Sequence, residues 1–430
     1  MIKLKKVHIF LIICALTILI TSTGCGSRAQ TGEPIDRTGV SEENAGGVSE
    51  IAHSVDGTVD DAGTSGTDGV DNAVCPEISI VMVGDILLHT PVAESGVQED
   101  GSYNFDAVFA NVKEEVAAAD LAIVNQEVII GGEELGVSGY PCFNAPYELG
   151  DALVDAGFDV VLHATNHALD KGSKGINNCI SFWKNNYPQI AVLGINESEE
   201  EQKNIYVYEK DGVKIAILNY TYGTNGIPLP EKMPYAVNML EKEKVAEDIG
   251  KAKEIADFII VCPHWGTEYR LTPSAEQEQW ADFFLENGVD LVIGTHPHVI
   301  EPIEWVGDDN GNEMLVYYSL GNFVNWTSGR GEGVANRMVG GMAQITVTRN
   351  EDGEVCILDY GVEPLVCHLR EGANGVTTYF LSDYTRQMAE ENMIIAQDAE
   401  FSAEYCESLC REVWSGIFGI RSSYLFKSTQ

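Results

Sequence analysis

Five short apolar segments of this sequence each run into a residue that carries a carboxylate, an amide or an imidazole. The segments are 77–83, 121–124, 159–162, 258–262 and 290–293. Because amphipathic helical stretches separate them, the sequence predicts an α/β core with its chemistry at the carboxyl ends of the strands. One polar residue at such a place is commonly a helix cap or a hydrogen-bonded core histidine. Five at one edge of a sheet are hard to explain in that way.

The last of these segments shows the pattern most clearly. The stretch 290–293 leads through a tight Gly294-Thr295 turn to His296 and His298. Side chains two apart in extended backbone point the same way, and Pro297 restricts the backbone between them. The pair is therefore placed to bind one metal ion or two neighbouring ions. The alternative is two loop histidines that only form hydrogen bonds.

The other strand ends carry a similar set of donors. Asp85 follows the first strand, as a candidate metal ligand or a helix cap, and Glu127 follows the second. Asn166 and His167 follow the third strand, and His264 follows the fourth. Oxygen and imidazole donors without a thiolate favour Mn, Fe, Zn or Mg over a structural cysteine-zinc site.

Six sequence blocks, taken in order, resemble the CapA family, which is named for poly-gamma-glutamate capsule biosynthesis and is related to the calcineurin-like metallophosphoesterases. The resemblance covers about residues 78–350. The blocks are Gly84-Asp85, Asn125-x-Glu127, Thr165-Asn-His-Ala-Leu-Asp170, His264-Trp-Gly-x-Glu-Tyr269, Gly294-Thr-His-Pro-His298 and Ser319-Leu-Gly-Asn-Phe323.

The resemblance implies a four-layer α-β-β-α sandwich with two divalent metal ions at the strand ends. Glu127 is then the expected bridge between the ions, and His167 takes the place of the acid that protonates the leaving group. The metal ligands that the resemblance implies are Asp85, Glu127, Asn166, His264, His296 and His298.

The chain departs from the related phosphoesterases at one position. Many of them carry a histidine two residues after the first aspartate, where this chain has Leu87. One metal site is therefore expected to have fewer ligands, unless His89 or His163 compensates.

Further candidates for substrate contacts or for supporting the ligands lie near the same blocks. A Gly-rich loop, 329–341, is expected to cover the site and to supply a guanidinium for an anion, from either Arg330 or Arg337. Three more candidates are Asn125, Glu268 and Asn322.

The N-terminal residues have the pattern of a targeting segment. A basic start and the apolar run 8–20 indicate a secretory signal, and the small residues before Cys25 resemble a bacterial lipoprotein signal. We therefore expect residues 1–25 to be a signal peptide and Cys25 to be lipidated, which anchors the protein outside the cytoplasm. Plain secretion and an uncleaved anchor are the alternatives.

Residues 26–76 are rich in Gly, Ser, Thr, Asp and Glu, which predicts a disordered tether. The chain has a formal net charge of −40, which argues against nucleic acid as a partner, because phosphate recognition depends on Lys and Arg. An anionic substrate would need bound cations to supply positive charge locally.

The folded part is expected to comprise a core domain, 77–350, and a C-terminal region, 351–430. In the latter, 354–369 predicts a strand pair that extends the sheet, and 382–397 and 402–418 predict amphipathic helices packed on the core or on a partner. The cysteines fit no zinc or disulfide pattern, so we expect mostly free thiols.

Two functional hypotheses follow. The first is a metal-dependent hydrolase outside the cytoplasm, acting on a phosphoester or on an amide of a glutamyl polymer. The second is a non-catalytic subunit of an envelope polymer machine, in which the same cleft binds metal or polyanion while membrane synthase and export subunits do the chemistry.

Overall fold

Residues 76–415 and 417 are described by the computed structural model, and their strands form two sheets. The predicted signal peptide with Cys25, and the predicted tether up to residue 75, lie outside the described residues. Within the described part of the chain, no helix combines the length and the apolar character needed to cross a bilayer.

The first sheet has eight strands in the order β14-β13-β12-β1-β2-β3-β4, with β11 paired to β1. The strands β1 to β4 are parallel, and the strands β12 to β14 are antiparallel to their neighbours. The bounds are β1 Glu77–Ile86, β2 Leu121–Asn125, β3 Val160–Leu162, β4 Ala191–Leu193, β11 Asn322–Val324, β12 Val339–Arg349, β13 Val355–Leu369 and β14 Val376–Phe380.

The second sheet has six strands in the order β5-β6-β7-β8-β10-β9. Its four inner strands are parallel, and each edge strand is antiparallel to its neighbour. The bounds are β5 Tyr206–Lys210, β6 Val213–Thr221, β7 Phe258–His264, β8 Leu291–Ile293, β9 Ile303–Gly307 and β10 Glu313–Tyr317.

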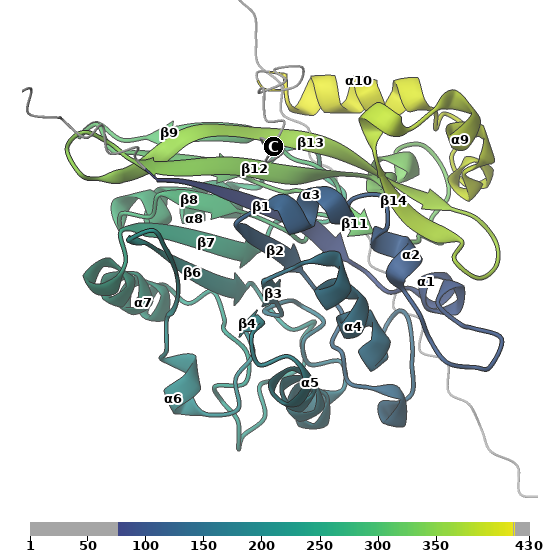
Figure 1. Cartoon of the computed structure of the whole chain (residues 1–430), viewed down its shortest axis with the longest axis horizontal. Helices are drawn as coiled ribbons and strands as arrows, with labels where there is room; N and C mark the ends of the chain where they lie inside the picture. The colour runs from purple at the N-terminus through teal and green to yellow at the C-terminus, as the bar shows by residue number, and fades with distance from the viewer. Residues whose placement is uncertain (1–75, 416, 418–430) are drawn as a thin grey trace, which may run out of the picture. The chain divides into compact units, whose positions relative to one another are not determined.

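Helices cover the outer faces of the sheets (Figure 1). Their bounds are α1 Thr90–Ser95, α2 Asp106–Phe109, α3 Lys113–Ala118, α4 Tyr147–Ala156, α5 Gly172–Asn186, α6 Glu199–Gln202, α7 Lys242–Ile255, α8 Ala275–Glu286, α9 Arg386–Glu391 and α10 Ala403–Val413. Short 3-10 turns occupy Glu133–Leu135, Val334–Met338, Leu381–Asp383 and Met393–Ala396.

The alternation of side chains along the second sheet produces the layers. Ile260 and Cys262 of β7 face the first sheet, and the Cys262 sulfur lies 3.8 Å from the sulfur of Met82 in β1. Ile259 and Val261, on the opposite face, pack in the cluster that holds the apolar sides of α7 and α8. The predicted four-layer α-β-β-α arrangement is therefore confirmed.

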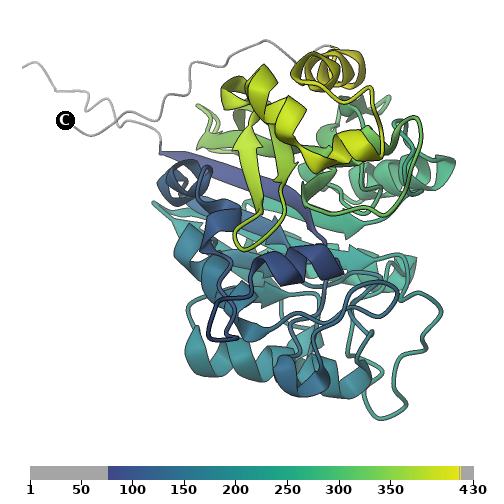
Figure 2. The ribbon, with the colours of Figure 1, turned by 90° about the vertical axis from the view of Figure 1, so that its right-hand side faces the viewer.

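The segment predicted as a strand pair over 354–369 is instead one strand, β13, which pairs with β12 on one side and β14 on the other. Pro364, which lacks an N–H donor, precedes the residues that pair with β14, so the strand continues through it without losing a bond to that neighbour. The C-terminal helices α9 and α10, coloured yellow, lie near β13 and β14 in Figures 1 and 2.

The described cysteines are all free thiols, and most of them are buried, in agreement with the prediction. Those that the structure describes are Cys142, Cys179, Cys262, Cys356, Cys367, Cys406 and Cys410.

A buried carboxyl group lies behind the loop that follows β8. Glu301 is fully buried, one of its oxygens accepts a hydrogen bond from Gln277 at 2.6 Å, and its other oxygen has no partner among the described residues. Burial raises the pKa of Glu301 to about 8, although Gln277 and Arg270 act against the rise. The native chain therefore holds this carboxyl in its neutral form near pH 7.

We expect Glu301→Gln to remove part of the pH dependence of stability. The carboxyl binds a proton more tightly in the native chain than in the unfolded chain, so its contribution is full below pH 4.5 and is lost as the pH rises to about 8. At about 1.4 kcal/mol per pKa unit, the wild type should lose up to about 5 kcal/mol relative to the variant over this interval.

Urea unfolding at pH 5 and at pH 8.5 measures this difference. Glu304→Gln, which changes an exposed glutamate three residues away, is the matched control and should follow the wild type. Parallel pH profiles for the wild type and Glu301→Gln would contradict the expectation.

Candidate metal centre

The ends of four strands meet at the junction of the two sheets and carry five donor side chains. Asp85 ends β1 and Glu127 follows β2 in the first sheet, while His264 ends β7 and both His296 and His298 follow β8 in the second. All five side chains are buried, with residue exposures from 0% to 4%. The sequence prediction that these donors converge is met by their positions.

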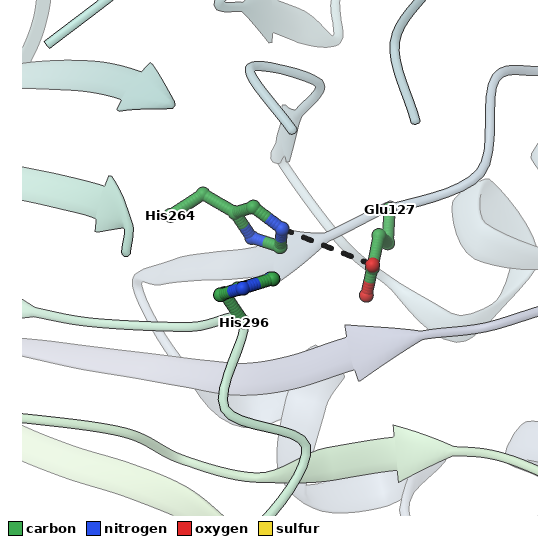
Figure 3. A group of neighbouring side chains, drawn as sticks. All are labelled: Glu127, His264 and His296. Carbon is green, nitrogen blue, oxygen red and sulfur yellow. Dashed lines mark ion pairs between the residues drawn. The ribbon is translucent and has the colours of Figure 1, made fainter. Parts of the chain in front are cut away.

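The donors form two groups that share one carboxylate. Glu127, His264 and His296 form the first group, and Asp85, Glu127 and His298 form the second. Within each group the ligand atoms lie within 4.8 Å of one another. Figure 3 shows the imidazoles of the first group beside the carboxylate of Glu127, with His264 Nε2 at 3.8 Å from Oε1.

Several polar atoms of the centre have no hydrogen-bond partner among the described residues. Both carboxylate oxygens of Glu127 and Nδ1 of His296 are buried and make no hydrogen bond with the described residues. Leaving such atoms unpaired costs about 1–3 kcal/mol each, and more for a charged group. The oxygen and imidazole donor set fits divalent cations of the Mn, Fe, Zn or Mg type. The residues present therefore fit divalent cations, and Glu127 belongs to both donor groups.

Burial is the largest influence on the pKa values of Glu127, His264 and His296. It raises the pKa of Glu127 well above its usual value. Burial and the neighbouring imidazoles lower the pKa of His264 and of His296 well below the usual value, so both are neutral, which is the form that binds metal. For His298, burial also acts to lower the pKa, but the carboxylates of Glu127 and Asp85 outweigh it and raise the value to about 9.

The orientation of Asp85 follows from the close approach of β11 to β1. A Cβ at Gly84 would lie 1.9 Å from the carbonyl oxygen of Gly321, so only glycine allows this approach. Asp85 then accepts a hydrogen bond from Asn125 Nδ2 at 2.8 Å and one from the backbone N–H of His296 at 3.2 Å. The predicted supporting role of Asn125 has this contact as its basis.

The two histidines after β8 converge for a reason that the sequence did not show. We expected an extended backbone, but φ is 102° at His296 and 59° at His298. Non-glycine residues rarely occupy this left-handed region, and such strain is found preferentially at functional sites. A sharply turned loop, not an extended one, directs both imidazoles toward Glu127.

Amides and a hydroxyl hold the imidazoles from the side. His264 Nδ1 lies 3.0 Å from Thr295 Oγ1, and its Nε2 lies 2.9 Å from the amide oxygen of Asn166. His298 Nδ1 lies 3.1 Å from the amide oxygen of Asn322. Asn166 therefore lies next to the first donor group, and Asn322 orients a histidine of the second.

His167, predicted as the acid, lies beside the centre on the loop that follows β3. Its Nδ1 is 2.7 Å from Asp170 Oδ2, and the same oxygen accepts a hydrogen bond from the backbone N–H of Phe143 at 2.7 Å. The amide nitrogen of Asn225 lies 3.3 Å from the imidazole and its amide oxygen accepts from Asn166. Asp170 and Asn225 thus fix the ring, a role that the sequence did not assign to either.

The three weaker candidates lie in different surroundings, and of these only His163 turns away from the centre. His163 packs in the core, where its Nε2 lies 3.6 Å from the sulfur of Cys179 and accepts a hydrogen bond from Trp183 Nε1 at 3.2 Å. It turns toward α5, because its side chain lies on the helix-covered face of the sheet. His89 lines a cavity together with His298, and burial is the largest cause that lowers its pKa to about 4. Glu268 is exposed.

The Gly-rich loop places only one of its two candidate arginines beside the centre. Arg330 is exposed, and its guanidinium donates to the carbonyl of Ala396 at 3.0 Å. Arg337 instead lines the cavity that also contains His298. Arg337 lies within the 3-10 turn Val334–Met338, whereas Arg330 lies in the loop before that turn.

Comparison with known proteins gives a family match over more than half of the chain. The model described as "Bacterial capsule synthesis protein PGA_cap" matches residues 79–327. The capsule biosynthesis protein CapA of Bacillus anthracis is 30% identical over 58% of this chain and 61% of its own length. The PGA biosynthesis protein CapA of Bacillus subtilis (strain 168) is 36% identical over 41% of this chain and 46% of its own length. The match thus spans less than two thirds of either relative.

Solved structures with a similar arrangement are more distant. The NAD nucleotidase NadN of Haemophilus influenzae is 14% identical, with a TM-score of 0.42 over 68% of this chain and 58% of that chain. The calcineurin-like phosphoesterase YfkN of Bacillus subtilis is 16% identical, with a TM-score of 0.37 over 68% of this chain and 91% of that chain. At these values neither likeness bears on the activity of this chain.

Proposed function

This chain belongs to the bacterial capsule synthesis protein family PGA_cap, and from that premise we propose that it is a metal-dependent hydrolase of capsule or poly-gamma-glutamate biosynthesis. The observation that supports the proposal best is the carboxylate of Glu127. It is buried, accepts no hydrogen bond from the described residues, and lies between imidazoles of the other sheet, with His298 Nε2 at 3.7 Å and His264 Nε2 at 3.8 Å from Oε1. In a purely structural core, a buried carboxylate normally accepts hydrogen bonds.

Asp85, Glu127, Asn166, His264, His296 and His298 are the residues proposed to hold two divalent cations. When bound, such cations act as Lewis acids on a phosphoryl or carbonyl group. The substrate is proposed to be a phosphoester or a glutamyl amide, and an anionic polymer becomes compatible with the acidic chain only through those cations.

The protein side chains have defined tasks in this proposal. His167, held by Asp170, donates a proton from its imidazole to the leaving group, and Asn225 keeps the ring in place beside Asn166. Thr165 accepts a hydrogen bond from the backbone N–H of His167 at 3.2 Å and donates to the Glu127 carbonyl at 2.7 Å. These two hydrogen bonds connect the loop that carries His167 to the loop that carries Glu127.

The proposal extends to location and partners. Through a lipid on Cys25, the chain would be anchored to the outer face of the membrane, with plain secretion as the alternative. There it would work beside the membrane subunits that synthesise and export the polymer. Incorporation of a radioactive fatty acid into the wild type, and its loss in Cys25→Ser, would support the lipid anchor. A wild type that takes up no label would contradict it.

A second candidate function has its own support. Leu87 lies beside the second donor group, lining the cavity with His298, and offers that group no ligand. An incomplete second metal site favours a subunit that binds metal or polyanion without turnover.

Metal analysis beside a substrate screen separates the two candidates. The purified chain is loaded with Mn, Fe, Zn or Mg, and the hydrolysis of bis(4-nitrophenyl) phosphate and of γ-glutamyl-4-nitroanilide is followed before and after chelation. Turnover that is lost on chelation and restored by metal supports the hydrolase. Stoichiometric metal without turnover of any substrate supports the binding subunit. Failure to bind metal overturns the hydrolase and the metal-binding form of the second candidate.

A further inference from the structure

A cavity of about 240 Å³ opens beside His298. Most of its wall is polar or aromatic, and one permanent positive charge lies among the residues that line it. Its polar and aromatic lining residues, apart from His298, include His89, Tyr140, Tyr269, Asn325, Thr327 and Arg337. Tyr140 is 75% exposed and Tyr269 is 45% exposed, so both stand at the rim of the cavity.

Neutral groups hold the guanidinium of Arg337. Its central carbon lies 3.5 Å from the centroid of the Tyr269 ring, which is a cation–π contact, and Nη1 donates to Thr327 Oγ1 at 2.9 Å. Neither contact neutralises the charge. In a chain with a formal net charge of −40, a cation held by uncharged partners at the edge of a site is unusual.

The backbone of Arg337 and that of Tyr269 are fixed relative to the metal centre. The carbonyl of Arg337 accepts a hydrogen bond from Asn322 Nδ2 at 2.9 Å, and the amide oxygen of Asn322 lies 3.1 Å from His298 Nδ1. The backbone N–H of Tyr269 donates to the carbonyl of Pro297 at 2.7 Å, between the two histidines of the β8 loop. Both the arginine and its aromatic platform are thus tied to residues of the centre.

The hydrogen bonds to the loop do not require the side chain of Arg337. The loop is held through the backbone carbonyl of Arg337, which accepts from both Asn322 and Asn325. Any residue at position 337 could make those bonds. The guanidinium is therefore available for a partner from outside the chain, and planar guanidinium groups bind carboxylates and phosphates in preference to neutral ligands.

We propose that this cavity binds a second, non-reacting oxyanion of the substrate through Arg337, while the reacting group lies at the metal centre. The inference rests on the proposed function for the position of the reacting group. It restricts the substrate class to molecules that carry a separate carboxylate or phosphate beside the reacting phosphoester or amide.

Three ligands of matched length test the proposal by isothermal titration calorimetry on the metal-loaded full chain. Propylphosphonate carries one acidic group, 3-phosphonopropionate replaces its methyl group by a carboxylate, and propane-1,3-bisphosphonate adds a phosphonate instead. We expect one or both diacids to bind about tenfold more tightly than propylphosphonate. The diacid with the larger gain identifies the preferred oxyanion.

Variants of the two arginines test whether the gain in diacid affinity comes from the cavity. Arg337→Gln should remove the gain, whereas Arg330→Gln, which changes the exposed arginine of the same loop, should keep it. If Arg337→Gln does not fold, the pair Arg337→Lys and Arg330→Lys replaces it, because lysine keeps the charge but loses the planar group, and only the first should weaken diacid binding. Equal affinities for all three ligands in the wild type, or a gain that persists in the Arg337 variants, would overturn the proposal.

The calorimetry does not depend on turnover. A chain without hydrolytic activity that still shows the Arg337-dependent gain in affinity would support oxyanion binding in the cavity and would contradict the proposed hydrolase activity. Hydrolysis of the generic diester without any gain in diacid affinity would contradict oxyanion binding in the cavity and would leave the proposed hydrolase activity standing.

Discussion

Replacing His264 by alanine is expected to reduce metal binding to at most one ion per chain and to reduce hydrolysis by a factor of about 10³. The side chain is fully buried, and its Nε2 lies 3.8 Å from Glu127 Oε1 and 2.9 Å from the Asn166 amide oxygen. Loss of one cation removes several kcal/mol of stabilisation from the transition state, and about 1.4 kcal/mol corresponds to a tenfold change in rate.

Metal content and turnover of bis(4-nitrophenyl) phosphate measure the effect of His264→Ala. The matched control is His368→Ala, which removes another fully buried imidazole, one that contacts the Tyr384 hydroxyl at 2.8 Å in the C-terminal region. The control should lower the unfolding midpoint but keep the metal. A His264→Ala chain that retains two ions and full turnover would show that the donors do not act as a metal site.

Replacing His167 by asparagine is expected to reduce turnover by about 10²–10⁴ while leaving the metal content unchanged. The imidazole contacts Asp170 at 2.7 Å and has an exposure of 6%, so it is held in one orientation at the edge of the centre. The loss should be largest for diesters with an alkoxide leaving group, which needs a proton. It should be smallest for 4-nitrophenolate, which leaves without one.

The dependence on the leaving group separates a proton donor from a structural residue. His89→Asn provides the control, because His89 and His167 contact the ring of Phe143 at centroid distances of 5.1 and 4.6 Å, and only His167 is paired with Asp170. The control should affect all leaving groups alike. An equal loss for alkoxide and nitrophenolate leaving groups in His167→Asn would mean that His167 only supports the fold.

The sequence predicted the converging donors because strand periodicity is strong in this chain. Apolar segments such as 258–262 predict their own strands, and a polar residue after such a strand, such as His264, must come to the edge of its sheet. The strand end is therefore predictable without knowing which strands are neighbours. Asp85, Glu127 and His298 follow from the same rule.

Features that depend on local backbone geometry were not predictable. The left-handed conformation of His296 and His298 has no sequence signal, since neither is glycine, and we expected an extended loop. His163 lies only three residues before Asn166, and nothing in the sequence shows that its side chain turns away toward Trp183. The choice between Arg330 and Arg337 depends on a five-residue 3-10 turn, and a stretch of that length leaves no periodic pattern to read.

The donors of the centre come from two sheets whose other contacts include apolar packing such as that of Met82 against Cys262. Bound cations would link the two sheets of the sandwich, because Asp85 and Glu127 come from one sheet and His264 and His298 from the other. Ions that bind only the native chain raise its stability by mass action. Maturation of the protein would then follow the local supply of metal, and metal-starved cells would contain a chain that proteases remove more readily.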